Sequence, residues 1–274
     1  MRALPVAILA VVLLAPSPFA SGQELEAIAR SGLPALSRNW SGPEYAQAAD
    51  VIAKGRVPLP RLSDPEGAAI LARLLSTENL SLCRNAALPL KMRLPDFAKI
   101  IGSTGQIIMV YLKAAGDKQS APHEELARLM AFMLQVSAQG GELADELLLE
   151  IPEDETYATR MNGLKQMRSG LTSVFIGAET SLGETGTYVA ADLSIILEAM
   201  AATLPQLKKA FAKDVVIELR RKLERDRQRF TGADGLRLDA MIRELAVQEP
   251  LAPAGTPPAV PKLDPSPGAA PARG

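Results

Sequence analysis

Apolar side chains recur at helical spacing along most of the chain. Between Pro122 and Gly140 they follow the i, i+3, i+4, i+7 spacing of one helix face, at Leu126, Leu129, Met130, Met133 and Val136. No segment alternates apolar and polar residues with period two for long enough to indicate a strand. The pattern therefore predicts an all-α fold, arranged as a multi-helix bundle.

Prolines, glycines and capping residues set the expected helix boundaries. Ser63 or Asp64 is expected to cap a helix that begins at Pro65, with Glu66 near the positive end of its dipole. Residues 57–60 are expected to form an extended linker. The expected helices cover residues 23–30, 44–54, 65–75, 95–112, 122–139, 142–151, 154–181, 188–204, 205–230 and 235–247.

Each of the following three expectations depends on one local feature of the sequence. Gly140 and Gly141 are expected to end one helix, because glycine is a poor helix former. Pro205 is expected to begin another. The apolar run over residues 107–112 is expected to lie deep in the core, and its helical neighbours favour a helix over a buried strand.

The first 22 residues have the pattern of an export signal. Arg2 precedes an apolar run over residues 3–15, prolines follow, and Ala20-Ser21-Gly22 provides a small-x-small cleavage motif. The sequence therefore predicts cleavage between Gly22 and Gln23. The alternative is an uncleaved membrane anchor, although the run is shorter than the roughly 20 residues of a spanning helix.

The remaining chain divides by composition into a helical part and a tail. Residues 23–248 are expected to form one helical domain or two packed helical subdomains divided near residues 117–121. Residues 249–274 are rich in proline and alanine, so they bury too little apolar surface to offset their ordering entropy. This tail is predicted to be disordered, with the function of a spacer or docking peptide left open.

Charge and cysteine content exclude some classes of protein. Removal of residues 1–22 takes away Arg2 and no acid, so the formal charge changes from −1 to −2. This balance argues against a sequence-independent nucleic-acid-binding protein. Cys83 is the single cysteine, so no intrachain disulfide forms, and its apolar surroundings predict a buried, inert thiol.

The single histidine has neighbours that resemble a metal or acid–base site. His123 precedes Glu124 and Glu125, but the second histidine of a zincin motif is absent, so the acids are expected to stabilise a helix start. Met130 and Met133 share a helix face with His123, which raises copper(I) as a ligand. Both methionines also occupy expected core positions, and the core interpretation is favoured.

Two charged segments are candidates for functional surfaces. The acidic segment contains Glu142, Asp145, Glu146, Glu150, Glu153, Asp154 and Glu155. It could bind calcium, or its carboxylates could converge in a hydrolase site, but an ordinary solvated surface is favoured. A basic segment over residues 208–229 could contact anionic membranes, although interleaved acids favour a solvated or intrachain-paired face. Its bases are Lys208, Lys209, Lys213, Arg220, Arg221, Lys222, Arg225, Arg227 and Arg229.

Three glycines recur every seven residues within one predicted helix. Gly163, Gly170 and Gly177 would form a groove at which another helix backbone could approach closely. A contact with the helix over residues 188–204 is expected, and a dimer interface is the second interpretation.

Taken together, the residues predict an exported, periplasmic helical protein that acts by binding or assembly, with no ligand identified. A membrane-surface protein and a hydrolase are the alternatives, and a non-enzyme is favoured because no catalytic motif is present. No catalytic, cofactor-binding or metal-ligating residue is assigned, and no cofactor is expected.

Overall fold

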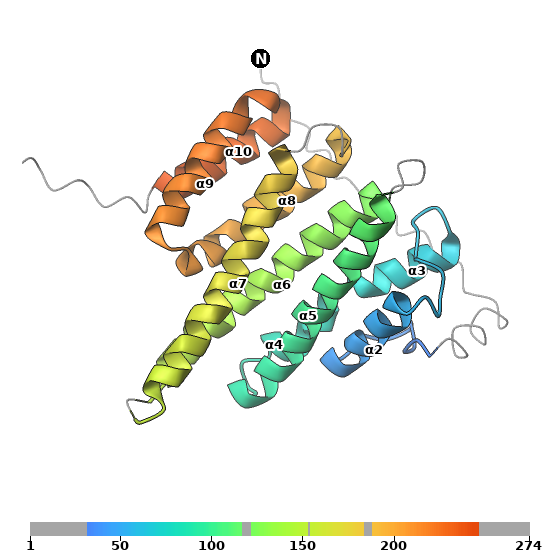
Figure 1. Cartoon of the computed structure of the whole chain (residues 1–274), viewed down its shortest axis with the longest axis horizontal. Coiled ribbons are helices and arrows are strands. Elements are labelled where there is room, and N and C mark those ends of the chain that lie inside the picture. Colours follow the sequence, from blue (N-terminus) through green and yellow to red (C-terminus); the bar gives the residue numbers. More distant parts are fainter. Residues whose placement is uncertain (1–31, 117–121, 153, 184–187, 247–274) are drawn as a thin grey trace, which may run out of the picture.

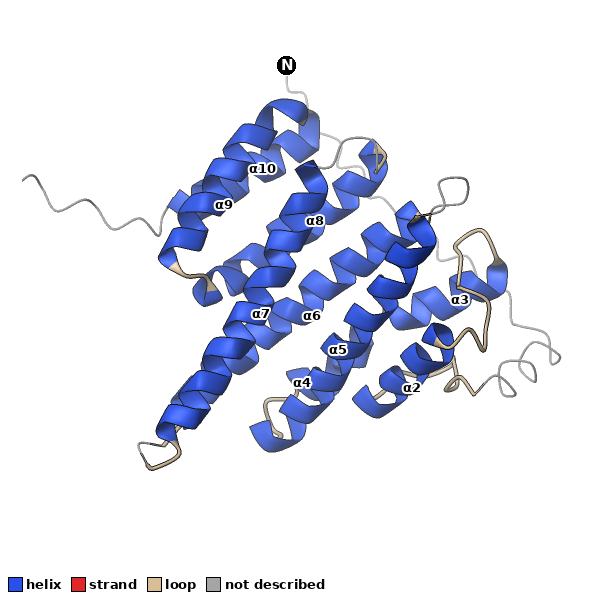
Figure 2. Ribbon diagram, in the orientation of Figure 1, coloured by secondary structure: helices blue, strands red, loops and turns tan. Residues whose placement is uncertain are grey.

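The computed structural model describes residues 32–116, 122–152, 154–183 and 188–246. All regular structure in these ranges is helical, which confirms the predicted all-α fold (Figures 1 and 2). The α-helices are α2 (Gly42–Ala53), α3 (Pro65–Leu74), α4 (Ser81–Arg84), α5 (Leu90–Ala115), α6 (His123–Glu150), α7 (Tyr157–Gly183), α8 (Ala190–Leu207), α9 (Lys213–Asp226) and α10 (Gly232–Ala246). Short 3-10 turns are η1 (Thr77–Leu80), η2 (Lys208–Ala210) and η3 (Arg227–Arg229).

Helix α6 is the central element of the bundle. It contacts α5, α7 and α8, while α2 packs against α5 at one end and α9 and α10 pair at the other (Figure 1). One continuous hydrophobic core extends from Leu33 to Leu245. The face of α6 predicted from the sequence lies in this core, because Leu126, Leu129 and Val136 are almost fully buried.

Several predictions concern residues outside the described ranges. These are the export signal over residues 1–22, the helix over residues 23–30, the division near residues 117–121 and the tail over residues 249–274.

Two helix starts have the capping interactions that their sequences favour. Glu44 in the first turn of α2 accepts hydrogen bonds from the Ser41 backbone N–H (3.1 Å) and hydroxyl (2.9 Å), and it pairs with Arg38. Asp64 caps α3, because its carboxylate accepts a hydrogen bond from the Gly67 N–H at 2.8 Å. These contacts satisfy backbone donors that lack partners in the first helical turn.

The Gly140–Gly141 pair does not end a helix, contrary to prediction, and α6 continues through it to Glu150. A Cβ atom at Gly140 would lie 2.4 Å from Phe97 Cζ on α5 and 2.9 Å from Leu171 Cδ2 on α7. Side chains of two neighbouring helices therefore fill the space beside Gly140 that a Cβ atom would occupy. Tertiary packing outweighs the low helix propensity of glycine here.

Pro205 does not begin a helix either, because it lies inside the last turn of α8. The break comes later, at Phe211 and Ala212, whose extended ψ angles are 135° and 154°. The predicted continuous helix over residues 205–230 is thus replaced by η2, α9 and η3. The break rotates the following residues, so Val216 is buried and Val215 only partly buried.

The apolar run over residues 107–112 is helical, as predicted, but only part of it is in the core. Ile107, Ile108 and Tyr111 are buried within α5, whereas Met109 is 64% exposed and Leu112 is 46% exposed. Successive side chains of a helix point in different directions, so the side chains of a continuous apolar run cannot all lie on one buried face.

A buried polar cluster links α2, α4 and α5. Asp96 accepts a hydrogen bond from the Gly42 N–H at 2.5 Å, and the Cys83 thiol lies 3.6 Å from its second oxygen. Arg93 donates to the Cys83 carbonyl at 2.8 Å and pairs with Glu146. Burial and the Asp96 carboxylate raise the pKa of Cys83 to about 12, so the thiol is buried and poorly ionised, as predicted.

Candidate functional site

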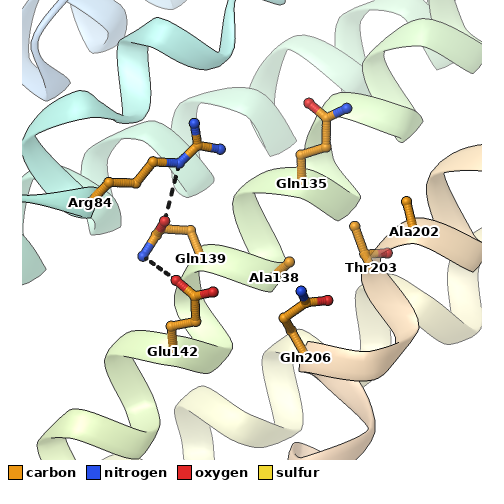
Figure 3. A pocket seen from close by; sticks show the side chains of 8 residues that line it. All are labelled: Arg84, Gln135, Ala138, Gln139, Glu142, Ala202, Thr203 and Gln206. Atoms are coloured by element: carbon orange, nitrogen blue, oxygen red, sulfur yellow. Dashed lines mark hydrogen bonds between the residues drawn. The ribbon is translucent and has the colours of Figure 1, made fainter.

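A pocket of about 510 Å³ opens between α4, α6 and α8. Three helices supply its lining, which consists of Arg84, Gln135, Ala138, Gln139, Glu142, Ala202, Thr203 and Gln206 (Figure 3). Its volume falls within the roughly 300–1,000 Å³ of small-molecule pockets. Unlike most such pockets, this one is lined mainly by amide, hydroxyl and charged side chains.

One side of the pocket is a chain of hydrogen bonds centred on Gln139. Arg84 Nε donates to Gln139 Oε1 at 3.3 Å, and Gln139 Nε2 donates to Glu142 Oε2 at 3.1 Å (Figure 3). Arg84 also donates from Nη1 to the Thr77 carbonyl at 3.4 Å, which holds its guanidinium near the end of α4. The carboxamide of Gln139 therefore bridges a cation and an anion.

The opposite side of the pocket is supplied by α8. Thr203 is buried and donates its hydroxyl hydrogen to the Ala199 carbonyl at 2.7 Å. The Gln206 backbone carbonyl lies 3.4 Å from the position of a Cβ at Gly141, which is an ordinary van der Waals distance between α8 and α6. Oε1 of Gln206 is buried and accepts no hydrogen bond from any described residue, which leaves this side chain with an unused acceptor.

The electrostatic character of the pocket is dipolar. Arg84 and Glu142 are the charged residues among its lining, and their formal charges cancel. Both side chains are exposed to solvent at the rim, while Gln139 between them is only 5% exposed. This arrangement can bind and orient a polar solute, and it holds one carboxylate rather than the facing pair of a glycosidase.

The residues around His123 do not converge on one site. Glu124 pairs with Arg128 at 2.8 Å, whereas Glu125 is buried and accepts from the Leu62 N–H at 2.9 Å and from Arg61. The His123 ring lies edge-on to Tyr188, with 5.9 Å between ring centres. Glu125 therefore anchors the segment before α3 to the start of α6.

The two methionines considered as copper ligands are part of the apolar core. Met133 is 7% exposed, and Met130 packs against the core from a partly buried position. Met133 Cε lies 3.6 Å from the position of a Cβ at Gly105 on α5, so it fills the space beside that glycine.

The described acids of the 142–155 segment that form ion pairs have different partners. Asp145 pairs with Arg168 and Lys209, and Glu146 pairs with Arg93. The Thr156 hydroxyl and backbone N–H hold the pKa of Asp154 below its usual range. Glu142 belongs to the pocket, Glu150 and Glu155 are exposed, and Glu153 lies outside the described residues.

The basic segment over residues 208–229 is largely paired with acids of this chain. Lys208 contacts Glu244, and Lys222 lies 3.1 Å from the buried Glu179. Further pairs join Lys209 to Asp145, Arg220 to Glu224, Arg225 and Arg229 to Asp226, and Arg227 to Asp239. Burial raises the pKa of Glu179, although Lys222 opposes this effect.

The glycine stripe is not a helix-packing groove within the described chain, contrary to prediction. Gly163, Gly170 and Gly177 are exposed on α7, and a Cβ at each would meet no described atom within 4 Å. The glycines at which a Cβ atom would meet another described residue too closely are instead Gly42, Gly67 and Gly140.

Sequence reasoning identified Glu142 as one of several acids but missed the rest of the pocket. Gln135, Gln139 and Glu142 lie at i, i+4 and i+7 on α6, which is a visible signal. A polar stripe of this kind is typical of an ordinary solvated face. Arg84 and Thr203 come from distant parts of the chain, so no local spacing indicates that they join it.

No family model, curated protein or solved structure matches this chain. Among the described helices, none is both long and apolar enough to cross a membrane. Within the same ranges, no three His, Cys, Asp or Glu side chains are grouped as a metal site would require.

Proposed function

We propose that the protein is exported to the periplasm, loses residues 1–22, and acts there by binding a small polar molecule. The observation that carries the binding proposal is the pocket between α4, α6 and α8, whose buried Gln139 is held between Arg84 and Glu142. Export rests on the signal pattern at the N-terminus. Binding is favoured over hydrolysis because the pocket holds one carboxylate and the described acids nearby are paired elsewhere.

Export is tested by fractionating cells that express the full-length chain and sequencing the N-terminus of the product. A periplasmic product that begins at Gln23 is the expected result. A membrane-bound product that retains Met1 would overturn this part of the proposal and favour the membrane-surface alternative.

Binding is tested by incubating the protein with the small-molecule fraction of a periplasmic extract and identifying what is released on denaturation. The comparison variant is Ala202→Trp, which places a bulky ring at the exposed rim of the pocket. We expect a compound enriched by the natural chain and lost with the variant. Equal recovery from both proteins would show that the pocket is not the binding site.

A further inference from the structure

The charges of the pocket restrict the class of molecule that it would bind. An anion would satisfy Arg84 but be repelled by Glu142, and a cation would have the opposite difficulty. A molecule with both charges satisfies both residues. We infer that the ligand is a zwitterion of the α-amino acid class, with its carboxylate on Arg84 and its ammonium on Glu142; this inference rests on the proposed binding function.

The two hydrogen bonds of Gln139 set an upper limit on the separation of the two charges. Hydrogen bonds of 3.3 and 3.1 Å, joined by the amide O–N separation of about 2.3 Å, place Arg84 Nε within about 8.7 Å of Glu142 Oε2. Gln139 spans this gap with one oxygen and one nitrogen. The carboxylate and ammonium of an α-amino acid are also joined through few bonds, so they can make a parallel bridge from the open side of the pocket.

Two further features of the pocket agree with an α-amino acid as the ligand. The buried Oε1 of Gln206 has no hydrogen-bond donor among the described residues, and an unsatisfied acceptor is costly. The terminal torsion of glutamine is broad, so this oxygen can turn toward a donor in the pocket. The pocket, with a volume of about 510 Å³, leaves room for the side chain of the amino acid.

The experiment is a calorimetric titration of the protein with L-alanine and two analogues that each lack one charge. N-acetyl-L-alanine has no ammonium, and L-alaninamide has no carboxylate. We expect each analogue to bind at least about tenfold more weakly than L-alanine, because one charge-assisted contact is lost.

Two variants assign the charges to residues. Glu142→Gln should weaken L-alanine binding by about tenfold while leaving the affinity for N-acetyl-L-alanine no lower. Arg84→Gln should weaken L-alanine binding by a similar factor while leaving the affinity for L-alaninamide no lower. Glu150→Gln and Arg128→Gln are the matched controls, since both residues are exposed on α6 outside the pocket, and should leave all three affinities unchanged.

The outcomes separate this inference from the proposed function. Equal binding of the analogues, no binding of L-alanine, or no effect of Glu142→Gln would overturn the zwitterion class. If a compound from the extract is still lost with Ala202→Trp, the pocket remains the binding site and only its ligand class is wrong. If that loss is also absent, the binding function fails as well.

Discussion

Replacing Gly140 with alanine tests the packing at the centre of the bundle. The new Cβ would lie 2.4 Å from Phe97 Cζ, 2.9 Å from Phe97 Cε2 and 2.9 Å from Leu171 Cδ2. These distances are far below the 3.5–4.0 Å or so of favourable carbon–carbon contacts. Phe97 and Leu171 belong to α5 and α7, so side chains of two helices must shift to admit the new methyl group.

Two opposing effects set the size of the change. Overpacking a core costs about 1–3 kcal/mol, and contact with two side chains places this site near the upper value. Alanine in place of glycine favours the helix by about 1 kcal/mol. The net expectation for Gly140→Ala is a loss of about 2 kcal/mol in the free energy of unfolding.

Gly177→Ala is the matched control, because its Cβ would meet no described atom within 4 Å and its residue is also inside a helix. This variant should gain about 1 kcal/mol from helix propensity alone. The assay is equilibrium unfolding in urea followed by circular dichroism, in which the two midpoints should move in opposite directions. A Gly140→Ala protein as stable as the natural chain would refute the three-helix contact.

Other interactions lead to predictions about charge and reactivity. Arg38 and the Ser41 N–H lower the pKa of Glu44 from 4.5 to about 2. The ionised Glu44 side chain therefore stabilises the fold above pH 4.5, and this contribution to stability is lost as the pH falls through 2. Glu44→Gln keeps a side chain that can cap the helix, but it should lower the free energy of unfolding by about 0.5–1 kcal/mol near neutral pH. At the acid limit the variant and the natural chain should be equally stable. A loss of the same size at all pH values would contradict this prediction. Burial raises the pKa of Glu179, so its ionisation opposes folding, and this effect grows as the pH rises through the folded pKa. The stability of Glu179→Gln relative to the natural chain, measured by thermal unfolding, should therefore increase as the pH rises above about 4.5, the usual pKa of a glutamate. A difference that is constant with pH would show that the pKa of Glu179 is not raised. Because burial and Asp96 raise the pKa of Cys83 to about 12, a thiol reagent near pH 8 should react about a thousandfold more slowly with native than with unfolded protein, and equal rates would contradict the buried position.

The sequence was sufficient for the helical class and for most core positions, because the apolar spacing on α6 and α7 places Leu129 and Leu171 on buried faces. Boundaries were wrong where local propensity opposed packing. Gly140 has an unfavourable helix propensity, but its lack of a side chain leaves the space that Phe97 and Leu171 fill. Pro205 is tolerated in the last turn of α8, where Leu204 and Leu207 remain buried.

The glycine stripe and the pocket were misread or missed for a related reason. Spacing identifies which residues share a helix face, but it does not identify what lies opposite that face. The exposed stripe of Gly177 and the buried site of Gly140 therefore look alike in the sequence. Likewise, the side chains of Gln139 and Glu142 line a pocket only because other helices bring Arg84 and Thr203 next to them in the fold.

Gln139→Leu distinguishes a structural from a functional use of the buried amide. Leucine has a similar size and gains from burial, and the two partners of Gln139 are exposed, so Arg84 and Glu142 can be rehydrated when the amide is removed. The expected change in the free energy of unfolding is therefore within about 1 kcal/mol. The pocket loses its bridge between the two charges, so L-alanine binding should fall by about tenfold or more. Urea unfolding and calorimetry measure the two quantities on the same protein. A stability loss above about 2 kcal/mol with unchanged binding would show that the amide serves the fold instead.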